Sequence, residues 1–154
     1  MFSSLLVLHS MFRWIVLVSL LFAIFRGFYG WNKNRPFTKL DNTTRHWTAT
    51  ISHIQLMIGV WLYFISPWVA YVFRNYSDAV SNREARFFGV EHAPMMLLAI
   101  TIISIGSAKA KRKATDQQKF KTMALWYTVG LIIILINIPW SFSPFVSRPE
   151  FRMF

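Results

Sequence analysis

The sequence predicts an all-α membrane protein whose four transmembrane helices form an up-down-up-down bundle. Of its 154 residues, 55% are hydrophobic and only 15% are charged, a balance typical of membrane proteins rather than soluble domains. Four long tracts are almost free of charge, and a helix needs roughly 20 apolar residues to cross the hydrocarbon core. These tracts are too long and too continuously apolar for barrel strands, so we expect helices, which satisfy their own backbone hydrogen bonds in lipid.

The predicted spans use most of the chain, which we expect to form one domain, residues 1–154. The spans are about 5–25, 46–70, 87–108 and 121–141. The first is interrupted only by Arg13 and the third only by Glu91, whereas the second has no charged residue. Because the first tract lacks a basic leader and a small-residue cleavage site, we interpret it as a retained span. Short connections favour antiparallel neighbours, and no room is left for a soluble catalytic domain.

The net charge of +11 is concentrated in the connections that follow the first and third spans. The basic residues there are Arg26, Lys33, Arg35, Lys39 and Arg45 in one group and Lys109, Lys111, Arg112, Lys113, Lys119 and Lys121 in the other, 11 of the 17 in the chain. Basic loops are typical of the cytoplasmic side, so we expect both termini to lie outside. Anionic membrane lipids suffice as partners for these loops, and the distribution argues against nucleic acid.

The absence of cysteine excludes disulfides, thiolate metal sites, iron–sulfur clusters and covalently attached haem. No Ser-His-Asp, HExxH or phosphate-loop pattern supports hydrolase or phosphotransfer chemistry. Three histidines lie inside predicted spans and away from the span ends, and ionisable residues at membrane depth are functional candidates by default. They are His9, His53 and His92.

His9 and His92 are predicted at similar depths on diagonal helices. With Leu5 and Phe87 as outer boundaries, a rise of 1.5 Å per residue places them roughly 6 Å and 8 Å below the outer surface. Across a four-helix bundle, two facing imidazoles can ligate one haem iron from opposite sides. The alternative is that each histidine only hydrogen-bonds a neighbouring helix.

A histidine that ligates haem iron needs a hydrogen-bond acceptor for its other ring N–H. Candidate acceptors are Ser10, Glu91, Ser141 and the Val90 carbonyl, which Pro94 would release from helix bonding. Arg13 lies one turn from His9 and would be neutralised by a haem propionate or, in a purely structural role, by Glu91.

His53 and His46 lie seven residues apart on one helix face, so they cannot be opposite ligands of one iron. We expect His46 to be interfacial. His53, roughly 10 Å inside the cytoplasmic boundary, has no histidine partner on the fourth span, where Met123 is the nearest conventional ligand. A second haem there is therefore doubtful, and His53 would otherwise bind a quinone oxygen, a propionate or another helix.

Five short segments spread along the chain carry a family resemblance. They are Leu8-His9-Ser10 with Arg13-Trp14, His53-Ile54-Gln55-Leu56 leading to Gly59 and Leu62-Tyr63-Phe64, Arg86-Phe87-Phe88 with Glu91-His92, Lys109-Ala110-Lys111, and Ile138-Pro139-Trp140. Together they resemble small bacterial membrane proteins labelled cytochrome B. The resemblance implies a b-haem protein of the bacterial inner membrane, in the style of quinol-linked cytochromes, with His9, His92 and His53 matching the family's histidines. Ser107 stands where that family often has a histidine, which argues against an inner haem.

The leading hypothesis is therefore a b-type haem protein that transfers electrons, with the quinone pool as partner and possible quinol-linked oxidoreductase activity. His9 and His92 would be the axial ligands, Arg13 would bind a propionate, and His53 would serve an inner haem or a quinone. A second hypothesis is a cofactor-free accessory or assembly subunit of a larger membrane complex. A third is a copper-handling protein, since Met11, Met95 and Met96 lie near the histidines in sequence and thioethers suit Cu(I).

Overall fold

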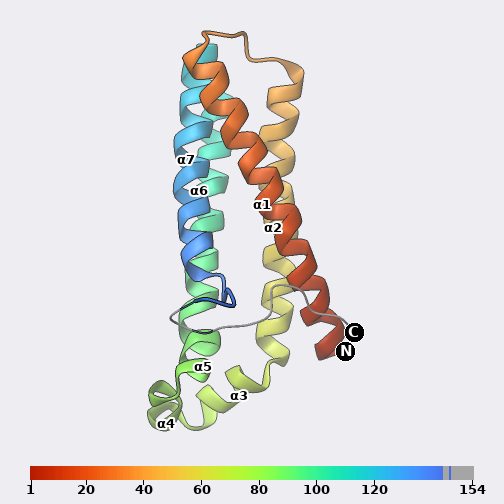
Figure 1. Cartoon of the computed structure of the whole chain (residues 1–154), viewed down its shortest axis with the longest axis vertical. Helices are drawn as coiled ribbons and strands as arrows, with labels where there is room; N and C mark the ends of the chain where they lie inside the picture. Colours follow the sequence, from red (N-terminus) through yellow and green to blue (C-terminus); the bar gives the residue numbers. More distant parts are fainter. Residues whose placement is uncertain (144–145, 147–154) are drawn as a thin grey trace.

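Four long helices form the body of the protein in the computed structural model, which describes residues 1–143 and 146 (Figure 1). They are α1 (Phe2–Asn32), α2 (Lys39–Ile65), α6 (His92–Arg112) and α7 (Asp116–Asn137). Three short helices and a π-helical turn lie between α2 and α6: α3 (Pro67–Arg74), α4 (Tyr76–Ser81), α5 (Arg83–Arg86) and η1 (Phe87–Glu91). The four long segments, the third extending over Arg83–Arg112, are long and apolar enough to cross a membrane. The predicted fold class is confirmed.

The helices pack in the order expected of an up-down-up-down bundle. The helix α1 packs against α2 and α7, and α6 packs against the same two helices, so α1 and α6 are diagonal. Both basic connections, 33–38 and 113–115, lie at one end of the bundle, and the N-terminus and the end of α7 lie toward the other (Figure 1). The first residues of α1 and α6 therefore belong to the same, non-basic end.

The start of α2 is fixed by a capping box in the first basic connection. The Thr38 side chain accepts from the Asp41 backbone N–H, while the Asp41 carboxylate accepts from the Thr38 backbone N–H at 2.9 Å. This reciprocal arrangement satisfies two donors that a helix start would otherwise leave unpaired. The same carboxylate accepts from Arg26 of α1 at 2.6 Å, so the cap also joins α2 to α1.

The second span ends at Ile65 rather than continuing to residue 70. Ser66 has extended backbone angles, and Pro67 begins α3 in the first helical position. Proline restricts the residue before it to extended conformations and lacks the N–H that would continue α2. Helices α3, α4 and α5 then form an arm at the non-basic end (Figure 1), where the sequence predicts a polar segment with a short surface helix.

The third span enters the bundle through a π-helical turn. In η1 the backbone N–H of His92 donates to the Phe87 carbonyl five residues earlier. Continued by two residues, this pattern would require an N–H at position 94, which is proline. The chain reverts to α-helical bonding at His92, so the irregular backbone expected beside this histidine is present. Single π-turns often occur at functional sites.

The core of the bundle is organised around α7. Phe120, Met123 and Tyr127 on α7 are almost fully buried and pack with Leu20 of α1 and Ile103 of α6. The outer surfaces of all four long helices carry many exposed apolar side chains, which suit contact with lipid hydrocarbon.

Candidate cofactor site

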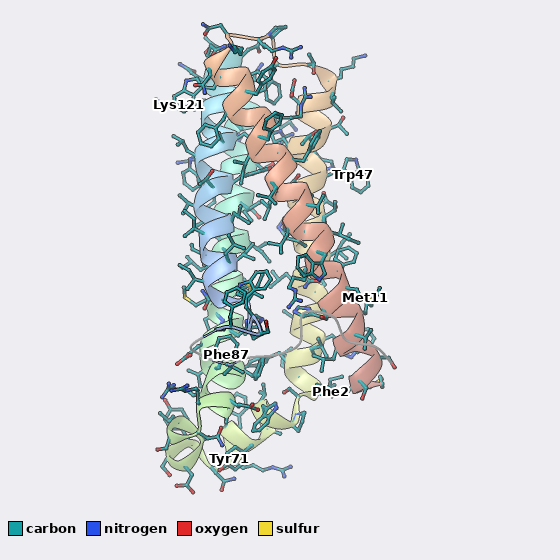
Figure 2. All side chains as sticks on the ribbon, in the orientation of Figure 1. Phe2, Met11, Trp47, Tyr71, Phe87 and Lys121 are labelled. Atoms are coloured by element: carbon teal, nitrogen blue, oxygen red, sulfur yellow. The ribbon has the colours of Figure 1, made fainter. Side chains whose placement is uncertain are left out.

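His9 and His92 face each other near the non-basic end of the bundle. Their ring centroids lie 6.5 Å apart, with the ring planes inclined at 74°. His9 is in the first part of α1 and His92 is the first residue of α6, and Figure 2 labels Met11 and Phe87 on the two segments that carry them. The sequence predicts that these two histidines form a pair, because they lie at similar depths on diagonal helices. The structure places them side by side.

His92 is oriented by the end of α7. Its Nδ1 lies 2.9 Å from the main-chain carbonyl oxygen of Asn137. A carbonyl only accepts, so Nδ1 carries the proton and Nε2 keeps its lone pair. The oxygen is available because α7 ends at Asn137 and the chain then turns through Ile138 and Pro139. The rings of Phe87 and Phe88, with centroids 5.5 Å and 6.3 Å from that of His92, further limit its rotation.

His9 lies against α2 beside a glycine. A Cβ atom built on Gly59 would stand 3.2 Å from Cε1 of His9, tighter than most contacts, so the absence of a side chain at this position makes room for the ring. The Gln55 side chain donates from Nε2 to the main-chain oxygen of His9 at 2.9 Å. Nδ1 of His9 and Oε1 of Gln55 are both buried without a hydrogen-bond partner in the part of the chain that the structure describes. Such unsatisfied buried polar atoms are uncommon and require an explanation.

Arg13 lies one helical turn from His9 in an aromatic environment. Its guanidinium carbon lies 5.4 Å from the ring centroid of Trp14 and 5.6 Å from that of Trp140. Cations are attracted to the faces of aromatic rings at such distances. The site thus combines two imidazoles with a nearby cation.

The two histidines form hydrogen bonds with residues to which the sequence assigned no role. Glu91, one of the acceptors predicted from the sequence, forms an ion pair with Arg86 at 2.8 Å. The acceptor for His92 is the main-chain oxygen of Asn137, and the polar neighbour of His9 is Gln55. An uncharged polar side chain inside an apolar span was the available signal for Gln55, whereas no side chain signals the main-chain oxygen of Asn137.

His53 lies apart from this pair, near the middle of α2 and on the exposed surface. Its Nε2 is 2.9 Å from Oγ of Ser104 on α6. Because the Ser104 hydroxyl donates to the Ile100 carbonyl at 2.7 Å, it accepts from Nε2–H of His53. Met123, considered as its haem partner, is instead buried in the core around α7.

His46 and Met11 are also directed outward. The His46 side chain is exposed and contacts the Trp47 ring at the basic end, as expected of an interfacial residue. Met11 is 57% exposed on α1, whereas Met95 and Met96 are half-buried one turn after His92. Of these three methionines, only the two on α6 are partly enclosed.

A separate polar network occupies the opposite half of the bundle. The buried guanidinium of Arg45 donates to the Ser107 hydroxyl at 2.6 Å and to its carbonyl at 3.1 Å, and also to the Asn42 side chain. The Tyr127 hydroxyl donates to the Arg45 carbonyl at 2.6 Å. The Ser107 position, where the resemblance implies a histidine in relatives, is thus engaged in tying α2 to α6.

Comparisons with protein-family models, with curated proteins and with solved structures found no match for this chain.

Proposed function

We propose that the protein is a membrane b-type haem protein that transfers electrons, with His9 and His92 as the axial ligands of one haem. The observation that carries this proposal is the separation of 6.5 Å between their ring centroids. Two imidazoles bound on opposite sides of one metal, each through a bond of about 2 Å, place their ring centres about 6 Å apart. The pair thus already has the spacing that such ligation requires.

The surroundings of the two rings fit the proposed group. His92 donates from Nδ1 to a carbonyl, the arrangement that fixes the tautomer of a ligating histidine and leaves Nε2 for the metal. Nδ1 of His9 and Oε1 of Gln55 both lack a partner among the described residues, and Gln55 already donates to the main-chain oxygen of His9, so its amide is the candidate acceptor for Nδ1–H. Arg13 would bind a propionate. When bound, haem supplies one-electron oxidation and reduction, and the protein supplies position and electrostatics.

The proposed electron partner is the quinone pool, with the basic end in the cytoplasm and the protein in a bacterial inner membrane. His53 supports a quinone contact because it is a lipid-exposed imidazole at membrane depth whose Nε2–H is held by Ser104. Its Nδ1 would then be an acceptor for a quinol hydroxyl. A histidine exposed to hydrocarbon needs such a partner from the membrane or from a neighbouring subunit.

The test is an absorption spectrum of protein purified after haem-sufficient expression, recorded oxidised and after dithionite reduction. We expect a Soret band and a reduced α band that are lost or shifted in His9→Ala and in His92→Ala. His46→Ala is the matched control, because His46 is exposed and distant along α2, and it should leave the spectrum unchanged. Absence of haem bands in the wild type, or their persistence in both variants, contradicts the proposal.

A cofactor-free accessory or assembly subunit is the second candidate. It is favoured by the His53–Ser104 and His92–Asn137 contacts, which are interhelical hydrogen bonds of the kind that stabilise membrane bundles without any cofactor. Purification with a stoichiometric partner and without haem would support it. Copper without haem in metal analysis would instead support the third hypothesis, with Met95 or Met96 completing the site.

A further inference from the structure

Two lysine–tryptophan pairs flank α7 at the basic end of the bundle. Nζ of Lys121 on α7 lies 5.2 Å from the ring centroid of Trp31 on α1. On the other side, Nζ of Lys109 on α6 lies 4.6 Å from the ring centroid of Trp126 on α7. Figure 2 labels Lys121 near this end. Each pair spans a seam between α7 and a neighbouring helix, so we call them the two seam pairs.

The acidic residues near these pairs are already neutralised. Asp41 accepts from Arg26 at 2.6 Å, and Asp116 accepts from Lys119 at 3.0 Å. Among residues 1–143 and 146, neither seam lysine forms an ion pair with a carboxylate. The end of the bundle therefore keeps a large excess of positive charge that the protein itself does not balance.

The seam pairs hold their ammonium groups without using their hydrogen-bond donors. A ring face attracts the charge, while the N–H groups of the lysine stay available. Both lysines are exposed and both tryptophans are half-buried, and tryptophan is typical of the headgroup level of a membrane. Beyond Trp126, farther from the basic end, α7 presents exposed Val129 and Ile132.

We propose that the two seam pairs are binding sites for anionic phospholipids, each ammonium contacting a lipid phosphate while the acyl chains follow the apolar surface of the neighbouring helices. Basic groups between transmembrane helices, at a cytoplasmic membrane surface, are suited to anionic headgroups. The indole would lie between the phosphate and the hydrocarbon, which restricts where the lipid sits. The proposal requires no haem, so it stands or fails independently of the function proposed above.

The experiment is native mass spectrometry of delipidated full-length protein titrated with phosphatidylglycerol or with phosphatidylcholine. We expect tight binding of about two phosphatidylglycerol molecules and weaker binding of phosphatidylcholine. The double variant Lys109→Gln with Lys121→Gln should lower the phosphatidylglycerol affinity by about fivefold for each lysine removed. Lys33→Gln with Lys39→Gln is the matched control, because it removes the same charge from exposed lysines at the same end.

The conservative double variant Lys109→Arg with Lys121→Arg separates binding from folding, because it keeps both charges and should keep the affinity. Equal losses in the seam and control variants would mean that diffuse charge alone attracts the lipid, which overturns the proposal. Equal affinities of the wild type for the two lipids would also overturn it.

Discussion

The side chain of Gln55 on α2 donates a hydrogen bond to the main-chain oxygen of His9 on α1, at 2.9 Å. This contact fixes the two helices relative to each other at the level of the histidine pair. It also positions an amide whose Oε1 has no hydrogen-bond partner among the described residues. Gln55, to which the sequence analysis assigned no role, is thus the polar neighbour of His9, a proposed ligand.

Replacing Gln55 by leucine should weaken both the bundle and the site. Interhelical hydrogen bonds in membranes contribute on average ~0.6 kcal/mol and at most ~1.7 kcal/mol, so we expect a loss of about 1 kcal/mol of unfolding free energy. Titration with dodecyl sulfate, followed by circular dichroism, measures it. Gln118→Leu is the control, because Gln118 is an exposed residue in the first turn of α7. If haem is bound, the Gln55 variant should also shift its midpoint potential, and an unchanged potential would argue against a hydrogen bond from His9 to Gln55.

Gly59→Ala should displace the His9 ring without unfolding the protein. The new methyl group would stand 3.2 Å from Cε1 of His9, so the ring or α2 must move by a few tenths of an ångström. The measurement is the ring-proton NMR spectrum of the four histidines. The His9 resonances should shift, whereas those of exposed His46 and His53 should not. Uniform shifts in all of them would indicate a general rearrangement rather than a local contact.

Tyr63→Phe should destabilise the π-helical entry to α6. The Tyr63 hydroxyl donates to the Gly89 carbonyl at 2.9 Å, and in the π pattern that carbonyl would otherwise point to the nitrogen of Pro94, which has no hydrogen. Loss of a partner by a buried acceptor costs about 1–3 kcal/mol. Hydrogen exchange of the η1 amides should accelerate in this variant. Tyr76→Phe, at an exposed tyrosine of α4, should leave the exchange rates unchanged.

Ser107→Ala should destabilise the basic half of the bundle while leaving the histidine pair intact. It removes the hydroxyl that accepts from the buried Arg45 guanidinium at 2.6 Å, and only the Ser107 carbonyl remains for that nitrogen. Hydrogen bonds to charged groups contribute about 1.5–3 kcal/mol, so a loss near the lower value is expected in a dodecyl sulfate titration. Ser81→Ala, at the exposed end of α4, controls for the substitution itself. A stability equal to that of the wild type would show that the network does not support the fold.

The fold was predictable because lipid imposes a simple rule on sequence. A tract must be apolar over about 20 residues to span, and all four tracts obey this. The ends were less predictable, because they depend on local chemistry. Thr38 caps α2 several residues before the apolar tract begins. At the other end, hydropathy alone predicts a helix to residue 70, but α2 ends before Pro67.

The candidate site was predictable only as far as depth and helix order determine it. Their similar depth on diagonal helices predicted that His9 and His92 form a pair and that His53 lies apart from it. The structure has the same arrangement. The partner of His92 could not be found in this way, because it is a main-chain oxygen exposed by the end of α7 at Asn137. The pattern of side chains in a sequence does not indicate which main-chain carbonyl at a helix end is free to accept a hydrogen bond.

The position of α7 in the core has a consequence for biosynthesis. It is the most enclosed of the four spans, and it contacts both α1 and α6, yet the ribosome makes it after the other three. Until it is inserted, α1 and α6 are joined through α2 but not through α7, and His92 lacks the carbonyl that orients its ring. Closure of the bundle must therefore be a late event in assembly. Any group held between α1 and α6 would enter an unfinished bundle or wait for the last helix.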